Sequence, residues 1–156
     1  LGTEYLRRQT VHNNFQMEPP IDGIPENLDA FDIAPVVPLD LLRADFGKVD
    51  VLKIDIEGME YRAFMGAKAL MAEQKPITFL EYSPRFQSEI SGADGAALLT
   101  FFLDLDYGVE ILHRKKKRER VAGGDAAQVI AQVDAAWTRH VEDDRGTHLD
   151  LCLTAI

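Results

Sequence analysis

The sequence predicts an α/β fold built on a mostly parallel sheet with an antiparallel strand at one edge. Residues 49–56 are rich in β-branched side chains, which suits a strand buried in a parallel sheet. Strand-like and helix-like segments then alternate along the chain, the order that places helices between parallel strands. The final segment, 148–154, alternates leucines with polar residues, which is typical of a half-exposed antiparallel edge strand.

Two units are expected. Residues 1–35 carry prolines and a glycine at positions 19, 20, 23, 25 and 35, so we expect a loop-rich segment in which 1–9 could form a short helix. Residues 36–156 form the α/β domain, and Asp40 is a candidate N-cap of its first helix. The further elements expected are strand 49–56, helix 59–71, strand 77–82, a helix from Asp94 to about 105, strand 109–112, helix 126–136 and the final strand.

Composition excludes several classes of protein. The chain has 156 residues, 46% of them apolar, and a formal net charge of −9, which suits one globular domain and disfavours nonspecific nucleic-acid binding. The longest apolar runs are far short of the roughly 20 residues that span a bilayer. Its single cysteine excludes an internal disulfide. The chain starts at Leu1 without a signal-like segment, so we expect a fragment of a cytoplasmic protein.

Charged residues end two neighbouring strands. Asp55 and Glu57 follow the first strand, Lys53 precedes them, and Glu81 ends the next strand. Ligands of open parallel sheets bind at the carboxyl ends of the strands, so these residues could bind a cation, hold a ribose or substrate, or act as a base. Three carboxylates at one crevice should raise the pKa of at least one or attract a cation. In the structural alternative, Glu57 is a helix-terminus acid and Asp55 forms a turn.

Other reactive side chains give weaker signals. No metal-binding spacing links the histidines, so we assign no metal ligand and expect surface or half-buried roles for His12, His113, His140 and His148. Cys152 alternates with leucines and is expected to be a packing residue. The basic run 114–120 could contact a phosphate, a nucleotide sugar or an anionic lipid surface, although a solvated turn is favoured.

Residues 49–60 resemble a family signature. The segment Val-Asp-Val-Leu-Lys-Ile-Asp-Ile-Glu-Gly-Met-Glu is similar to the FkbM-type methyltransferases, in which a hydrophobic strand ends in Lys-Ile-Asp-x-Glu-Gly-x-Glu. The flanks agree: 36–40 is similar to an upstream segment ending in Leu-Asp, and Gly66-Ala67, Pro76 and 79–81 are similar to downstream positions of the family.

The resemblance implies a Rossmann-like class I fold that uses S-adenosylmethionine to methylate hydroxyl groups of small molecules or sugars. By this analogy Asp55 and Glu57 lie near the methyl-transfer centre, and Asp40 lies with Asp55 near the cofactor. Asp55 or Glu57 would remove the acceptor's proton, directly or through a metal-bound water, with Lys53 and Glu81 as further catalytic candidates.

The sequence lacks the family's glycine-rich first turn and the acidic end of its second strand. It therefore resembles the C-terminal part of such an enzyme, truncated in its N-terminal half, and the strand around Leu52 should have an exposed edge. We expect this edge to be covered by the N-terminal segment, by self-association into a homo-oligomer, or by a partner segment that is missing from the chain. The alternative function is a non-catalytic methyltransferase-like module that self-associates or binds a partner through this edge. A metal-dependent phosphotransfer or hydrolase site at Asp55 and Glu57 is less favoured, because no further nucleophile or basic residue ends a neighbouring strand.

Overall fold

The computed structural model describes residues 2–8, 15–17, 31–113 and 117–156. Near the amino terminus, β1 (Gly2–Arg8) pairs antiparallel with both β2 (Phe15–Met17) and β3 (Phe31–Val36). The short helix predicted for 1–9 is therefore wrong over 2–8, because pairing of residues 2–7 with β3 overrides a weak local pattern. The segment predicted to be loop-rich thus contains strands among its described residues.

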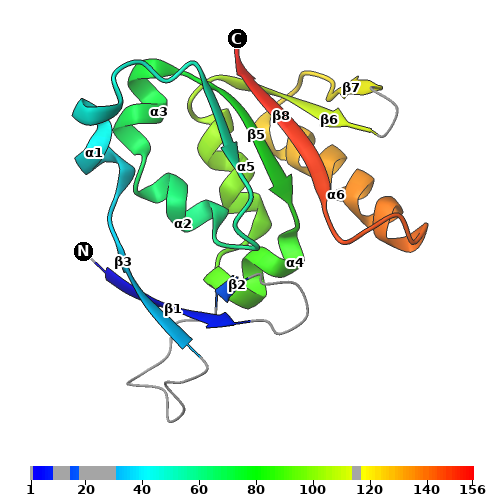
Figure 1. The fold of residues 1–156 in the computed structure, drawn as a ribbon. Helices are drawn as coiled ribbons and strands as arrows, with labels where there is room; N and C mark the ends of the chain where they lie inside the picture. Colours follow the sequence, from blue (N-terminus) through cyan, green and yellow to red (C-terminus); the bar gives the residue numbers. More distant parts are fainter. Residues whose placement is uncertain (1, 9–14, 18–30, 114–116) are drawn as a thin grey trace.

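The second sheet has five strands in the order β4-β5-β8-β6-β7. Figure 1 shows β8 (Leu149–Ala155) lying between β5 (Ile77–Tyr82) and β6 (Tyr107–Leu112). Among the described strands of this sheet, only β4 (Val51–Ile54) and β5 pair in parallel. β8 is antiparallel to both its neighbours, and β7 (Arg118–Arg120) is antiparallel to β6. The sheet is mixed.

The prediction of a mostly parallel sheet with an antiparallel edge strand is thus corrected. β8 is antiparallel, as expected, but it lies inside the sheet, and Leu151, Cys152 and Leu153 are buried. Its alternating sequence separates the two faces of the sheet, since Leu149, Leu151 and Leu153 point into the core and Asp150 points to the opposite face. Alternation by itself cannot distinguish that arrangement from an edge strand.

The helices follow the strands with one notable difference from prediction. The single helix expected over 59–71 is two helices, α2 (Glu60–Met65) and α3 (Lys68–Gln74). The helix is interrupted at Gly66, whose carbonyl accepts a hydrogen bond from the Asp40 amide at 2.9 Å. A Cβ added at this position would stand 3.1 Å from the Cα of Pro38. The remaining helical segments are α1 (Leu39–Phe46), α4 (Pro84–Phe86), the π-helical turn η2 (Gln87–Ser91), α5 (Gly95–Leu103) and α6 (Ala126–Glu142). Asp94 caps α5 as predicted, accepting from the Ala96 amide at 3.0 Å.

One face of the five-stranded sheet carries the core. Phe64 of α2 and Phe102 of α5 are fully buried and meet edge to face, with ring centroids 4.7 Å apart. They share one cluster with strand residues such as Leu80 and Leu151. Because successive side chains of a strand point to opposite faces, Glu81 and Asp150 lie on the other face, where Glu81 is half-buried and Asp150 is exposed. This face holds the candidate site.

β4 ends the five-stranded sheet within the described residues, so the predicted strand edge is present there. The amino-terminal strands pair with one another and not with β4. Val51 of β4 is 57% exposed. In the part of the chain that the structure describes, none of the helices combines the length and apolar character needed to cross a membrane.

Candidate active site

The carboxyl ends of β4 and β5 bring three predicted site residues together. The parallel register pairs Ile54 with Leu80, so the chain leaves β4 at Asp55 beside Glu81, the penultimate residue of β5. Lys53 lies on the same face of β4, because side chains two residues apart share a face. The structure therefore places these charged groups at one edge of the sheet.

Lys53 and Asp55 form an ion pair. The Lys53 ammonium donates to Asp55 Oδ2 at 2.6 Å, and the two side chains are 65% and 39% exposed. This hydrogen bond, more than the surrounding carboxylates, raises the pKa of Lys53 above its ordinary value. Lys53 therefore stays protonated and orients Asp55, and it is unsuited to act as a base.

Glu81 interacts with three other carboxylates and with one histidine. Partial burial raises its pKa, the nearby His148 opposes that change, and repulsion from Asp55, Asp150 and Glu57 raises it further. Burial contributes most to this rise in pKa, and the neighbouring carboxylates act in the same direction, which agrees with the expectation for clustered acids.

His148 and Asp150 lie beside Glu81 and were not predicted from the sequence as site residues. Together with Lys53, Asp55, Glu57 and Glu81 they form the charged cluster of the candidate site. Asp150 of β8 is the register partner of Glu81 in β5, and His148 Nε2 lies 3.4 Å from Glu81 Oε1. The alternation of 148–154 was a signal that His148 and Asp150 share a face. It could not show that β5 is the strand beside them.

The turn after β4 is tightly shaped. Glu57 is exposed and has a φ of 54°, and Gly58 follows with a φ of 99°. A Cβ at Gly58 would stand 2.6 Å from the Phe86 carbonyl oxygen, so both the backbone conformation and the space require glycine. The Glu57 carboxylate is thereby held at the surface beside the cluster.

A buried carboxylate, Glu60, holds this turn from inside and was not predicted as a site residue. Its Oε1 accepts from the amides of Ile56 at 3.1 Å and Gly58 at 3.3 Å, and its Oε2 accepts from Gln87 Nε2 at 2.8 Å. Glu60 is only 2% exposed, and desolvation raises its pKa. Glu60 is also the first residue of α2, where an acid interacts favourably with the helix dipole.

Asp40 lies apart from the cluster. Its carboxylate accepts from the amides of Ala69 at 3.0 Å and Leu70 at 2.9 Å, so it caps α3 rather than its own helix. The N-cap of α1 is Pro38. The cofactor role predicted for Asp40 remains a prediction, and these contacts favour a structural role.

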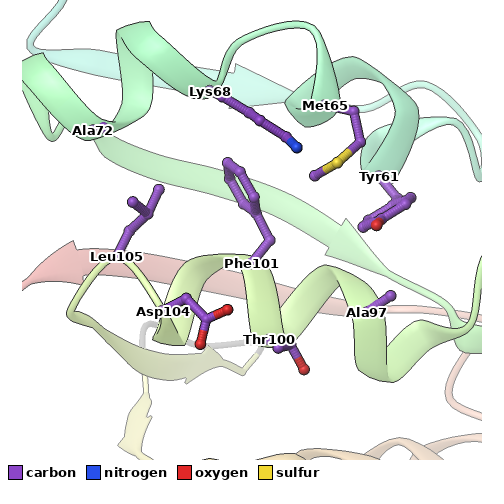
Figure 2. A pocket seen from close by; sticks show the side chains of 9 residues that line it. All are labelled: Tyr61, Met65, Lys68, Ala72, Ala97, Thr100, Phe101, Asp104 and Leu105. Atoms are coloured by element: carbon purple, nitrogen blue, oxygen red, sulfur yellow. The ribbon is translucent and has the colours of Figure 1, made fainter.

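One cavity adjoins the site and another lies away from it. One, of about 630 Å³, lies beside the cluster and is lined by three of the four histidines, His113, His140 and His148, together with Asp150. The other, of about 490 Å³, is a mainly apolar groove between α2, α3 and α5 that contains no member of the cluster. Figure 2 shows Met65 and Lys68 pointing into this groove from one side and Phe101 from the other.

The remaining predictions concern residues outside this cluster. Cys152 is buried in β8, as expected of a packing residue. The basic run falls partly outside the described residues, at 114–116, and its described end forms β7, in which Glu119 pairs with His113 at 2.8 Å. The prediction for His12 also lies outside the described residues.

Comparison of the sequence with known protein families shows to which family the chain belongs. The sequence matches the family described as Methyltransferase FkbM domain over residues 8–109. The chain belongs to this family. No curated protein and no solved structure gives a significant match.

The FkbM domain assignment confirms the resemblance found at residues 49–60 and supports methyltransferase activity at the level of the family. The matched region contains Lys53, Asp55, Glu57 and Glu81. His148 and Asp150 lie beyond it, and they join the cluster only because β8 enters the sheet next to β5.

Proposed function

We propose that this FkbM domain protein is an S-adenosylmethionine-dependent O-methyltransferase acting on a hydroxyl group of a small molecule or sugar. The observation that supports it is the group of carboxylates at the carboxyl ends of β4 and β5, inside the region that matches the family. Ligands of such sheets bind at this edge. The acidic chain disfavours a nucleic-acid substrate.

The described residues fit part of the cofactor. S-adenosylmethionine, when bound, supplies an electrophilic methyl group on a positively charged sulfur. The exposed carboxylates of Asp55 and Glu57 complement that positive charge. Both carboxylate oxygens of Asp40 accept hydrogen bonds from α3, so this proposal assigns Asp40 no part in cofactor binding.

Asp55 is the proposed base. Transfer of a methyl group to a hydroxyl forms a carbon–oxygen bond, breaks the carbon–sulfur bond and releases the hydroxyl proton. Asp55 accepts this proton, and Lys53 holds the carboxylate in place through its 2.6 Å hydrogen bond. Glu57, exposed two residues further on, is the alternative base, while Glu81 accepts a hydrogen bond from the acceptor and helps to align it.

Calorimetry and turnover test this proposal. We expect saturable binding of S-adenosylmethionine and S-adenosylhomocysteine, and formation of S-adenosylhomocysteine that depends on a hydroxyl-bearing acceptor in a screen. Asp55→Ala should lower turnover about 100-fold or more, the range for loss of a general base. Asp50→Ala is the matched control, because Asp50 is an exposed aspartate beside the opposite end of β4. A protein that binds neither compound, or an Asp55→Ala variant with normal turnover, would contradict the proposal.

The exposed edge of β4 favours a second candidate function, a non-catalytic module that self-associates or binds a partner strand. This candidate predicts a stable oligomer and no cofactor binding. Sedimentation at high protein concentration separates the two, since a monomer that binds S-adenosylmethionine fits only the enzyme.

A further inference from the structure

We propose that Glu81, His148 and Asp150 form a binding site for one divalent transition-metal cation. Each of the three residues offers one ligand atom, and these atoms all lie within 4.8 Å of one another. The set combines an imidazole nitrogen with two carboxylate oxygens, which distinguishes it from an ordinary group of surface acids.

The spacing of the ligand atoms suits a metal. His148 Nε2 and Glu81 Oε1 are 3.4 Å apart. Two ligand atoms bound to zinc at about 2.1 Å and at a tetrahedral angle are separated by about 3.4 Å. The third ligand atom, an oxygen of Asp150, lies within 4.8 Å of both and would have to approach to that spacing when a metal binds.

The backbone beneath the site is fixed. Glu81 and Asp150 are register partners in neighbouring strands, and β8 is paired on both sides, so their Cα positions are set by the sheet. His148 directly precedes β8 and comes from the same stretch of chain as Asp150. A site on paired strands is more precisely held than one on a loop.

The local charge favours a cation. Asp55 and Glu57 add negative potential at Glu81. The ammonium of Lys53 is paired with Asp55 and also interacts with Glu81 and Asp150, but the carboxylates outnumber it. A divalent cation would relieve this repulsion.

The cavity beside the triad leaves room for further ligands. His148 and Asp150 line the space of about 630 Å³, so the metal could keep open positions for water or for a substrate oxygen. An imidazole with two carboxylates favours Mn²⁺ or Zn²⁺ over Mg²⁺ and Ca²⁺, which prefer oxygen ligands alone. Cation binding does not depend on the proposed methyltransferase activity. If a hydroxyl acceptor occupies an open position, the metal would also lower the pKa of that hydroxyl.

Binding of Mn²⁺ to the whole protein, followed by electron paramagnetic resonance, tests the site without any activity assay. We expect one saturable Mn²⁺ per chain and a spin-echo signal from a coordinated imidazole nitrogen, neither of which excess Mg²⁺ removes. Zn²⁺ should compete for the same site. His148→Ala should abolish the nitrogen signal, and His148→Ala and Asp150→Asn should each weaken binding at least about tenfold.

Matched controls keep the test specific. Asp144→Asn removes a carboxylate from the same cavity but not from the triad, and His113→Ala removes another histidine that lines it, so both should bind Mn²⁺ normally. Circular dichroism of each variant verifies folding. The proposal is overturned if no saturable binding occurs below about 1 mM, if the nitrogen signal is absent, or if the controls weaken binding as much as the triad variants. S-adenosylmethionine is absent throughout, so failure here leaves the proposed function unaffected.

Discussion

Replacing Glu60 by alanine should strongly destabilise the protein, because this buried carboxylate holds the turn that carries Asp55 and Glu57. The substitution removes the acceptor of three N–H groups, those of Ile56, Gly58 and the Gln87 amide. An unsatisfied buried donor costs about 1–3 kcal/mol, so the loss of an acceptor for three donors should cost about 3 kcal/mol or more. Urea unfolding of Glu60→Ala and the unaltered protein measures this difference in the free energy of unfolding.

Glu60→Gln is the informative comparison. Gln87 is fully buried, and its Oε1 has no hydrogen-bond partner among the described residues. If the Gln87 amide turns over, this oxygen accepts from the introduced amide, while the introduced carbonyl still accepts from the turn. The exchange keeps the network and removes a buried charge, so Glu60→Gln should lie within about 1 kcal/mol of the unaltered protein.

The pH dependence gives a second, independent readout. Burial raises the pKa of Glu60 in the folded state, so folding favours the protonated form. Its contribution to stability is therefore complete below the pKa of an unfolded glutamate, about 4.3, and is lost as the pH rises through the raised value. Relative to Glu60→Gln, the unaltered protein should become less stable across that window. A difference that does not change with pH, or a loss below about 1 kcal/mol in Glu60→Ala, would refute this reasoning.

Two further substitutions test local geometry by thermal or urea unfolding. Gly58→Ala should cost about 3 kcal/mol or more, because the position has a positive φ and an added Cβ would meet the Phe86 carbonyl. Gly123→Ala, with open space around it, should stay within about 0.5 kcal/mol, and equal losses in the two variants would contradict the geometric argument. Asp40→Ala should cost about 1 kcal/mol by uncapping α3, whereas Asp45→Ala, an exposed aspartate of α1, should have little effect; a neutral Asp40→Ala would show that the cap contributes nothing.

Much of the candidate site could be predicted because it follows local rules. A β-branched run that ends in Asp55, Glu57 and Gly58 marks a strand followed by a sharp turn, and Glu81 ends the next strand along the chain. Two consecutive strands joined by helices pair in parallel, so their carboxyl ends meet. Glu60 could not be predicted as a site residue, because its buried hydrogen bond is to Gln87, 27 residues further along the chain.

The sequence alone determined the strands β4 and β5, the cap at Asp94, the carboxylates at the strand ends and the relationship to the FkbM family, since each depends on residues close together in the chain. Tertiary structure decided that β8 lies beside β5, which brings His148 and Asp150 to Glu81, and that Asp40 caps α3. Those contacts join segments about 30 or more residues apart. Such pairing is selected by side-chain packing across the whole sheet against the entropy of closing the intervening loops, and no local pattern of residues encodes it.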